Sequence, residues 1–257
     1  MKSILNNKII SERYFFPRKD YFENPYWIDC GNANLGCKYF IKDKSAKTII
    51  HFHGNGEIIS DYFSGFVPKF HELGYNIFLF EYRGYGMSNG NPELVTILND
   101  TELMIRQINL PLENIILFGR SVGSIYAIHA ASCFPEISGL IIESGIANIL
   151  ERMLMRVTPV ELNLDEDSFE NEVLKHFDNE SKISEFRGSS LFLHSEYDGL
   201  VDKTHAKKLF VAANEPKHLT IFPEGNHNTI ISVNWHEYFN LIDNFIKKIE
   251  ILPNSGK

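Results

Sequence analysis

The sequence of 257 residues predicts an α/β fold with a mainly parallel sheet. Six strand-length runs are apolar throughout instead of alternating with polar residues, which is typical of strands buried on both faces of a parallel sheet. Helix-length segments separate these runs, and strands that alternate with helices favour a parallel arrangement. No internal repeat or linker interrupts the pattern, so we expect a single domain spanning residues 1–257.

The expected elements follow one another in a regular order. The six strands lie at residues 48–53, 76–82, 114–119, 139–144, 190–194 and 217–223. The helices between and after them lie at residues 58–73, 92–108, 124–134, 203–213 and 235–251. Gly74 follows the first helix and Pro135 follows the third, and both are typical stop signals for a helix.

Two regions depart from this order. Residues 1–47 contain two segments that we expect to be extended, Lys8–Phe16 and Tyr26–Ile41, which would form an antiparallel edge or hairpin. Residues 145–186 exceed the length of one crossover helix, with an apolar piece (Ile149–Val157) before an acidic one (Glu161–Glu180). We interpret this stretch as a cap insertion over one end of the sheet, the alternative being two ordinary surface helices.

Composition excludes several classes of protein. The formal net charge of −8 is unsuited to nucleic acid or polybasic membrane binding, which depend on Lys and Arg. The three cysteines, Cys30, Cys37 and Cys133, give no disulfide framework and no CxxC spacing, so we expect neither disulfides nor a bound metal. No run of apolar residues suits a signal peptide or a spanning helix, which leads us to expect a cytoplasmic protein.

The sharpest motif is the pentad Gly119-Arg120-Ser121-Val122-Gly123, which lies where an expected strand ends and an expected helix begins. Glycines on both sides of a serine permit a tight strand-to-helix turn that presents the hydroxyl at the carboxyl edge of the sheet. The positive end of the helix dipole would favour negative charge developing there. We therefore predict that Ser121 is a nucleophile.

A serine nucleophile needs a base and an acid that orients it. His227 follows the last expected strand beside Gly225, and is the candidate base. Asp198, after the strand at residues 190–194, is the candidate acid. Its rivals are Glu196, Asp202 and Glu143.

The reaction also needs donors that stabilise an oxyanion. One is the backbone N–H of Val122, the residue after the nucleophile. The other is expected in the Gly-rich turn after the first parallel strand, where Asn55 is the candidate and Gly54 its rival. This turn lacks the Gly-Lys-Ser/Thr of a phosphate-binding loop and is not part of a dinucleotide-binding fingerprint.

Five ordered motifs together resemble the α/β-hydrolase superfamily of serine hydrolases. They are His53-Gly54-Asn55-Gly56, Glu81-Tyr82-Arg83-Gly84-Tyr85-Gly86-Met87-Ser88, Gly119-Arg120-Ser121-Val122-Gly123-Ser124, His194-Ser195-Glu196-Tyr197-Asp198 and Gly225-Asn226-His227, and Ser11–Pro17 adds to the likeness. The chain is similar to the small alpha/beta hydrolase domain-containing branch, which includes depalmitoylases and lysophospholipase-like hydrolases. The resemblance covers nearly the whole chain.

The resemblance implies an α/β-hydrolase fold: a mostly parallel eight-stranded sheet with its second strand antiparallel, helices on both faces, and a small cap after the sixth strand. It supports the order Ser121, Asp198, His227 for the triad. Arg120 is common in this branch, and we interpret it as a charge held by a carboxylate of the scaffold.

The predicted activity is hydrolysis of carboxylic esters or thioesters through an acyl-enzyme, without a cofactor. The expected partner is a small-molecule or acylated substrate, and its binding site would include Gly54, Gly56, Met153 and Leu154. Two other functions stay open. One is a serine peptidase of the aminopeptidase type or an acyltransferase with the same triad, and the other is a non-catalytic binding module.

Overall fold

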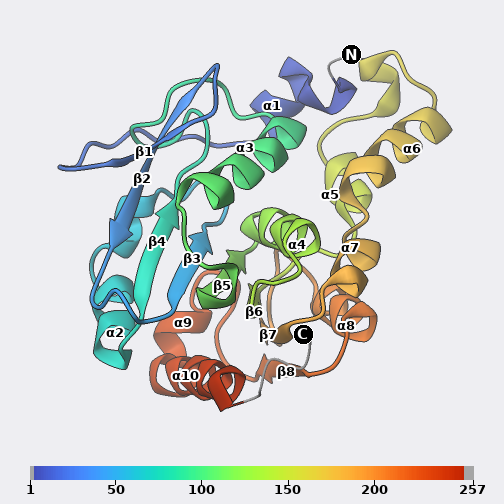
Figure 1. The fold of residues 1–257 in the computed structure, drawn as a ribbon. Helices are drawn as coiled ribbons and strands as arrows, with labels where there is room; N and C mark the ends of the chain where they lie inside the picture. Colours follow the sequence, from blue (N-terminus) through green and yellow to red (C-terminus); the bar gives the residue numbers. More distant parts are fainter. Residues whose placement is uncertain (1–2, 252–257) are drawn as a thin grey trace.

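The computed structural model describes residues 3–251, and it places one eight-stranded sheet between two layers of helices (Figure 1). The strand order is β1-β2-β4-β3-β5-β6-β7-β8. The two pairs β1–β2 and β2–β4 are antiparallel, and every later pair is parallel. The predicted α/β class and the mixed, mostly parallel sheet are therefore confirmed.

The observed elements agree closely with the predicted ones from residue 48 onward. The strands are β1 (Tyr26–Asp29), β2 (Asn34–Phe40), β3 (Thr48–Phe52), β4 (Asn76–Phe80), β5 (Ile115–Arg120), β6 (Gly139–Glu143), β7 (Ser189–Ser195) and β8 (Lys217–Phe222). The helices before β6 are η1 (Ile4–Asn6), α1 (Lys8–Tyr14), η2 (Ile59–Tyr62), α2 (Phe66–Leu73), α3 (Leu94–Gln107), η3 (Leu112–Asn114) and α4 (Gly123–Cys133). Those after it are α5 (Ile149–Leu154), η4 (Pro159–Leu162), α6 (Glu166–Phe177), α7 (Asn179–Glu185), α8 (Lys203–Ala212), α9 (Ile230–Val233) and α10 (Trp235–Ile251).

The central strands are buried on both faces, as their uninterrupted apolar sequence predicts. Every residue of β3, β4, β5 and β6 is buried. Neighbouring residues of one strand face opposite layers: Ile49 packs into the cluster with α2 and α10, and Ile50 into the cluster with α3 and α4. Because β3 and β5 to β8 run parallel, the loops after them meet at one edge of the sheet.

The first predicted extended segment is wrong, and the second is confirmed as a hairpin. Residues Lys8–Tyr14 form helix α1 in place of a strand. The side chain of Asn7 accepts a hydrogen bond from the N–H of Ile9 at 2.8 Å and caps the helix, and Ile10 and Tyr14, four residues apart, are both buried. The cap at Asn7 and the burial of one helix face outweigh the preference of the β-branched residues Ile9 and Ile10 for a strand.

The helix expected at residues 58–73 is two shorter elements. Gly65 has φ +82° and separates η2 from α2, because a residue in this region cannot continue a right-handed helix. The predicted stop at Gly74 is correct: this residue has φ +98° and its N–H bonds back to the carbonyl of His71.

The long segment between β6 and β7 contains α5, η4, α6 and α7 (Figure 1). Helix α6 buries Phe169, Val173 and Phe177 and leaves Glu166, Asp167 and Glu170 exposed. The segment is also bound to the N-terminal residues, since Ser3 donates to Glu172 at 2.5 Å and Arg13 pairs with Glu161 at 2.8 Å. Over residues 3–251, no helix has both the length and the hydropathy needed to span a membrane.

A substitution in the turn from β5 into α4 measures how tightly the edge of the sheet is packed. A Cβ on Gly123 would lie 2.1 Å from the carbonyl oxygen of Phe52, so helix and strand would have to separate. We expect Gly123→Ala to lower the free energy of unfolding by about 1–3 kcal/mol or more, measured by urea denaturation. The control is Gly199→Ala, which meets nothing within 4 Å and should change stability by no more than about 0.5 kcal/mol. Equal effects of the two substitutions would contradict this account of the turn.

Candidate active site

Ser121 occupies the tight turn that its flanking glycines predict. Its φ of +52° is unusual for a residue with a side chain, and its N–H donates to the carbonyl of Glu143 at 2.9 Å. A Cβ on Gly119 would lie 2.6 Å from the Cα of Ser124. As at Gly123, the backbone comes too close to leave room for a side chain, so the turn needs a glycine at both positions. A strained backbone held at a serine is a feature of functional sites.

The structure brings Ser121, His227 and Asp198 together. The Nε2 of His227 lies 3.0 Å from the Oγ of Ser121, and its Nδ1 lies 2.7 Å from the Oδ2 of Asp198. The serine is half-buried, and the other two residues are buried. The three side chains come from the loops after β5, β7 and β8, which meet at the carboxyl edge of the sheet.

Asp198 is held as a carboxylate. Its burial acts to raise the pKa, but the hydrogen bond and charge of His227, together with the N–H groups of Leu200 and Val201, lower it to about 2. Those N–H groups donate to Oδ1 at 2.9 and 2.8 Å, while Oδ2 faces His227. One oxygen is therefore fixed by the backbone, and the other orients the imidazole.

The three rival acids have other partners. Glu196 pairs with Lys203, and Asp202 caps helix α8 by accepting from the N–H of Thr204 at 2.9 Å. Glu143 pairs with Arg120 at 2.9 Å. Of the four candidates, Asp198 is the one that contacts His227.

A cavity of about 190 Å³ opens beside Ser121. Its walls combine the N-terminal segment, the loop after β3, the serine turn, the segment after β6 and the loops that carry Asp198 and His227. The lining residues are Tyr14, Phe16, Asn55, Glu57, Arg120, Ser121, Val122, Ile146, Arg152, Arg156, Leu200, Val201, His227 and Asn228.

The structure separates the two candidates for the second oxyanion donor. The N–H of Gly54 donates to Glu57 at 2.6 Å and is therefore occupied. Asn55 and Val122 both line the cavity, and within residues 3–251 neither of their backbone N–H groups has an acceptor. The side chain of Asn55 anchors the loop, because its Oδ1 accepts from Tyr85 at 2.8 Å and from the N–H of Phe16 at 3.1 Å.

The other predicted binding residues lie outside this cavity wall. Gly54 and Gly56 flank Asn55 in the loop but are not among the lining residues. Met153 is fully buried in the core, and Leu154, 47% exposed, points to the surface. Instead the apolar piece contributes Arg152 and Arg156, which the sequence analysis did not single out. Two arginines four residues apart in a largely apolar run were the signal that could have found them.

Comparison with known protein families matches residues 43–182 to the family described as "Serine aminopeptidase, S33". The match spans more than half of the chain and includes the pentad at Ser121. This protein belongs to that family of the α/β-hydrolase superfamily.

Relatives of known sequence agree with the assignment. The uncharacterized protein YfhR of Escherichia coli O157:H7 is 29% identical over 192 residues, which cover 72% of this chain and 64% of YfhR. Human alpha/beta hydrolase domain-containing protein 17B is 25% identical over 201 residues, covering 76% of this chain and 66% of the relative. The matched region thus spans somewhat less than two thirds of these relatives.

Solved structures confirm the α/β-hydrolase fold. Mouse alpha/beta hydrolase domain-containing protein 10 superimposes with a TM-score of 0.67 at 17% identity, covering 88% of this chain and 99% of that one. The Pyrococcus furiosus esterase Pf2001 gives a TM-score of 0.68 at 19% identity, covering 88% and 91%. At these identities the similarity establishes the fold alone.

Arg120 joins the separate walls of the site. Its guanidinium pairs with Glu57 at 2.6 Å and Glu143 at 2.9 Å, and donates to the carbonyl of His227 at 2.8 Å. Burial acts to lower the pKa of Arg120, but the two carboxylates outweigh it and raise the pKa. The interpretation of Arg120 as a charge held by scaffold carboxylates is confirmed.

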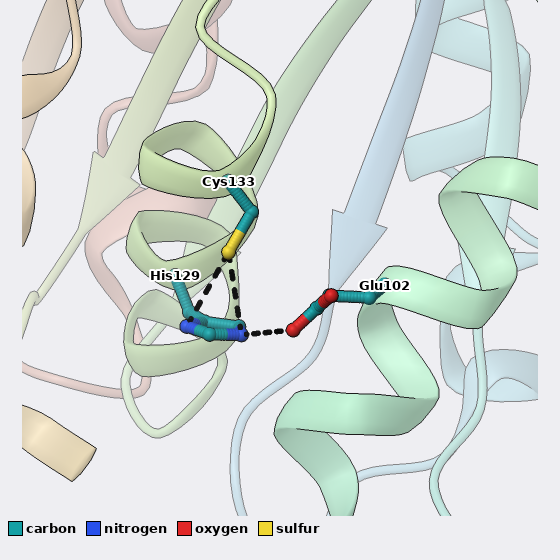
Figure 2. A group of neighbouring side chains, drawn as sticks. All are labelled: Glu102, His129 and Cys133. Atoms are coloured by element: carbon teal, nitrogen blue, oxygen red, sulfur yellow. Dashed lines mark hydrogen bonds and ion pairs between the residues drawn. The ribbon is translucent and has the colours of Figure 1, made fainter.

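A second cluster is formed by Glu102, His129 and Cys133 (Figure 2), and none of the three lines the cavity. Their ligand-type atoms lie within 4.8 Å of one another, but Lys182 places its ammonium 3.1 Å from the Nδ1 of His129. The pKa of Lys182, lowered by burial to about 8, keeps it mostly charged at neutral pH. The Nδ1 then accepts, so the Nε2–H donates to Glu102 at 3.1 Å and the ring has no lone pair left for a cation. We interpret this cluster as hydrogen bonds that join α3, α4 and α7.

The Arg120 network should dominate the stability of the site. Arg120→Met would leave the buried Glu143 without its cation, and we expect a loss of about 3–5 kcal/mol in the free energy of unfolding at pH 7.5. Burial already raises the pKa of Glu143 against the opposing charge of Arg120, and the variant would raise it further. Its folded state would then bind a proton more tightly than the unfolded state, so its stability should fall as pH rises, and the loss should be smaller at pH 5.

Urea denaturation at the two pH values measures both effects. The control is Lys247→Met, which breaks an exposed ion pair with Asp243 and should cost no more than about 1 kcal/mol. A loss below about 1 kcal/mol for Arg120→Met would contradict the network described here.

Proposed function

We propose that this protein is a serine hydrolase that cleaves carboxylic ester or thioester bonds through an acyl-enzyme on Ser121. The observation that carries the proposal is the pair of contacts made by His227, 3.0 Å to Ser121 and 2.7 Å to Asp198. A nucleophile, a base and an orienting acid in hydrogen-bond reach of one another are the requirement for this chemistry.

The proposed reaction proceeds in two steps. His227 takes the proton of Ser121 as the oxygen attacks the carbonyl carbon, and then returns it to the departing alcohol or thiol. In the second step His227 takes a proton from water as the water attacks the acyl-enzyme, and returns that proton to the Oγ of Ser121 as the acid is released. The N–H groups of Val122 and Asn55 would hold the oxyanion, and each such donor is typically worth about 10²–10³ in rate.

We propose that residues 145–186 act as a cap within a single domain of residues 1–257. Ile146, Arg152 and Arg156 of this segment line the cavity beside Ser121. The cavity of about 190 Å³ is smaller than the roughly 300–1,000 Å³ of common ligand pockets, which favours a small acyl group.

The second candidate is an aminopeptidase, which the description of the family favours. An aminopeptidase must hold the cationic amino terminus of its substrate, which calls for an available carboxylate. Among the described residues that line the cavity, the carboxylate is that of Glu57, which is already paired with Arg120, while Arg152 and Arg156 add positive charge. The charge of the wall therefore supports ester over peptide substrates. Acyl transfer to another acceptor would use the same acyl-enzyme, and a pure binding module would have no use for the triad.

Labelling with a fluorophosphonate tests the nucleophile. We expect rapid labelling of the wild type and none of Ser121→Ala, because the reagent bonds to an activated serine. Ester hydrolysis should fall by about 10⁴-fold or more in Ser121→Ala and by about 10⁴-fold in Asp198→Asn. Ser232→Ala, on the exposed surface of α9, is the matched control and should be labelled like the wild type. An unlabelled wild type, or a labelled Ser121→Ala, would refute the proposal.

A substrate panel separates the candidate activities. We expect p-nitrophenyl acetate and butyrate to be hydrolysed with higher kcat/KM than the decanoate, because the cavity is small. Aminoacyl naphthylamides should be poor substrates. Preferential cleavage of the naphthylamides would favour the aminopeptidase instead.

A further inference from the structure

The cavity beside Ser121 carries two positive charges that the proposed triad does not use. Arg152 lies on α5 and Arg156 two residues past its end, and both side chains line the cavity. Arg152 is half-buried, and Arg156 is exposed. The third arginine of the wall, Arg120, is neutralised by Glu57 and Glu143.

Neither cap arginine has a carboxylate partner within residues 3–251. The guanidinium of Arg156 donates to the carbonyl of Arg13 at 2.8 Å and lies 5.2 Å from the ring centre of Phe16. Arg156 therefore has a packing role at the cavity wall. Among the described residues, Arg152 donates one hydrogen bond, to the sulfur of Met155 at 3.3 Å, and most of its five N–H donors have no acceptor there.

The charge of Arg152 acts on a side chain at the cavity wall. Burial raises the pKa of Tyr14 at the cavity wall, and the charges of Arg152 and Arg156 act against this rise. The chain as a whole has a net charge of −8, so a wall with two unpaired cations runs against its overall charge. A half-buried guanidinium with free donors is suited to a planar carboxylate or a phosphate group.

We infer that the substrate carries an anionic oxygen group, a carboxylate or a phosphate, and that Arg152 binds it with support from Arg156. This inference rests on the proposed function and names its substrate class: a short ester or thioester with a negative group a few bonds from the reacting carbonyl. Ser121 attacks that carbonyl, and the anion held by Arg152 fixes the position of the carbonyl beside Val122 and Asn55. Arg152 is thus a specificity-determining residue.

Binding without catalysis provides the first test. Isothermal calorimetry at low ionic strength would measure glutarate and phenyl phosphate against neutral glutaramide, in order to tell a carboxylate site from a phosphate site. We expect one or both anions to bind to the wild type, and Arg152→Gln to weaken binding by about tenfold or more. Arg152→Lys keeps the charge and should recover part of the affinity. The matched control is Arg187→Gln, an exposed arginine just before β7 at the opposite edge of the sheet.

Kinetics provide the second test. The ratio of kcat/KM for p-nitrophenyl hemiglutarate to that for p-nitrophenyl pentanoate, which has the same chain length without the charge, reports the preference for an anion. We expect this ratio to exceed one in the wild type and in Arg187→Gln, to fall about tenfold in Arg152→Gln, and to recover partly in Arg152→Lys.

The outcomes distinguish this inference from the proposed function. Hydrolysis of both esters with a ratio that Arg152→Gln leaves unchanged, and no anion binding, would overturn the inference while the hydrolase function stands. Anion binding that depends on Arg152, with neither ester hydrolysis nor labelling of Ser121, would support the anion site and refute the hydrolase.

Discussion

The buried guanidinium of Arg120 is the interaction on which the geometry of the site depends. It joins three segments that are distant in sequence: Glu57 in the loop after β3, Glu143 at the end of β6, and the backbone of His227 after β8. Glu57 in turn accepts from the N–H of Gly54, and the next residue, Asn55, lines the cavity. One charge thus positions both the loop of Asn55 and the loop of His227, and it does so from the residue next to Ser121.

Most of the fold could be predicted because its signals are local. A strand buried on both faces needs an unbroken apolar run, and residues 48–52 and 115–119 have it. The closeness of Asp198 and His227 could be predicted because parallel topology brings the loops after successive strands to one edge. Helix α1 could not be predicted, because Ile9-Ile10 suits a strand equally well. The helix forms because Asn7 caps it and Tyr14 is buried.

The binding residues were the part of the site that sequence could not settle. Whether Gly54 or Asn55 offers its amide depends on one contact with Glu57, which no spacing rule encodes. Residues as distant in sequence as Phe16, Arg152 and Leu200 form the wall of the cavity. Which residues line it therefore depends on how the segment after β6 packs on the N-terminal residues. Met153 was the natural candidate for an apolar pocket, but its hydrophobicity buries it in the core, and the arginines on either side of it reach the cavity.

The burial of Met153 and the position of the two arginines at the cavity have a physical basis. A helix of six residues cannot be stable by itself, so it must bury an apolar face, and Ile149 and Met153 supply one. Arg152, one position before Met153, lies beside that face and is half-buried, and Arg156 follows two residues after the helix ends and is exposed. The charges of both arginines act on Tyr14 and oppose the rise in pKa that its burial causes, and the buried ring provides a low-dielectric wall. Charges beside such a wall act on a bound anion more strongly than they would in water, so the packing that holds the segment in place also strengthens its selectivity.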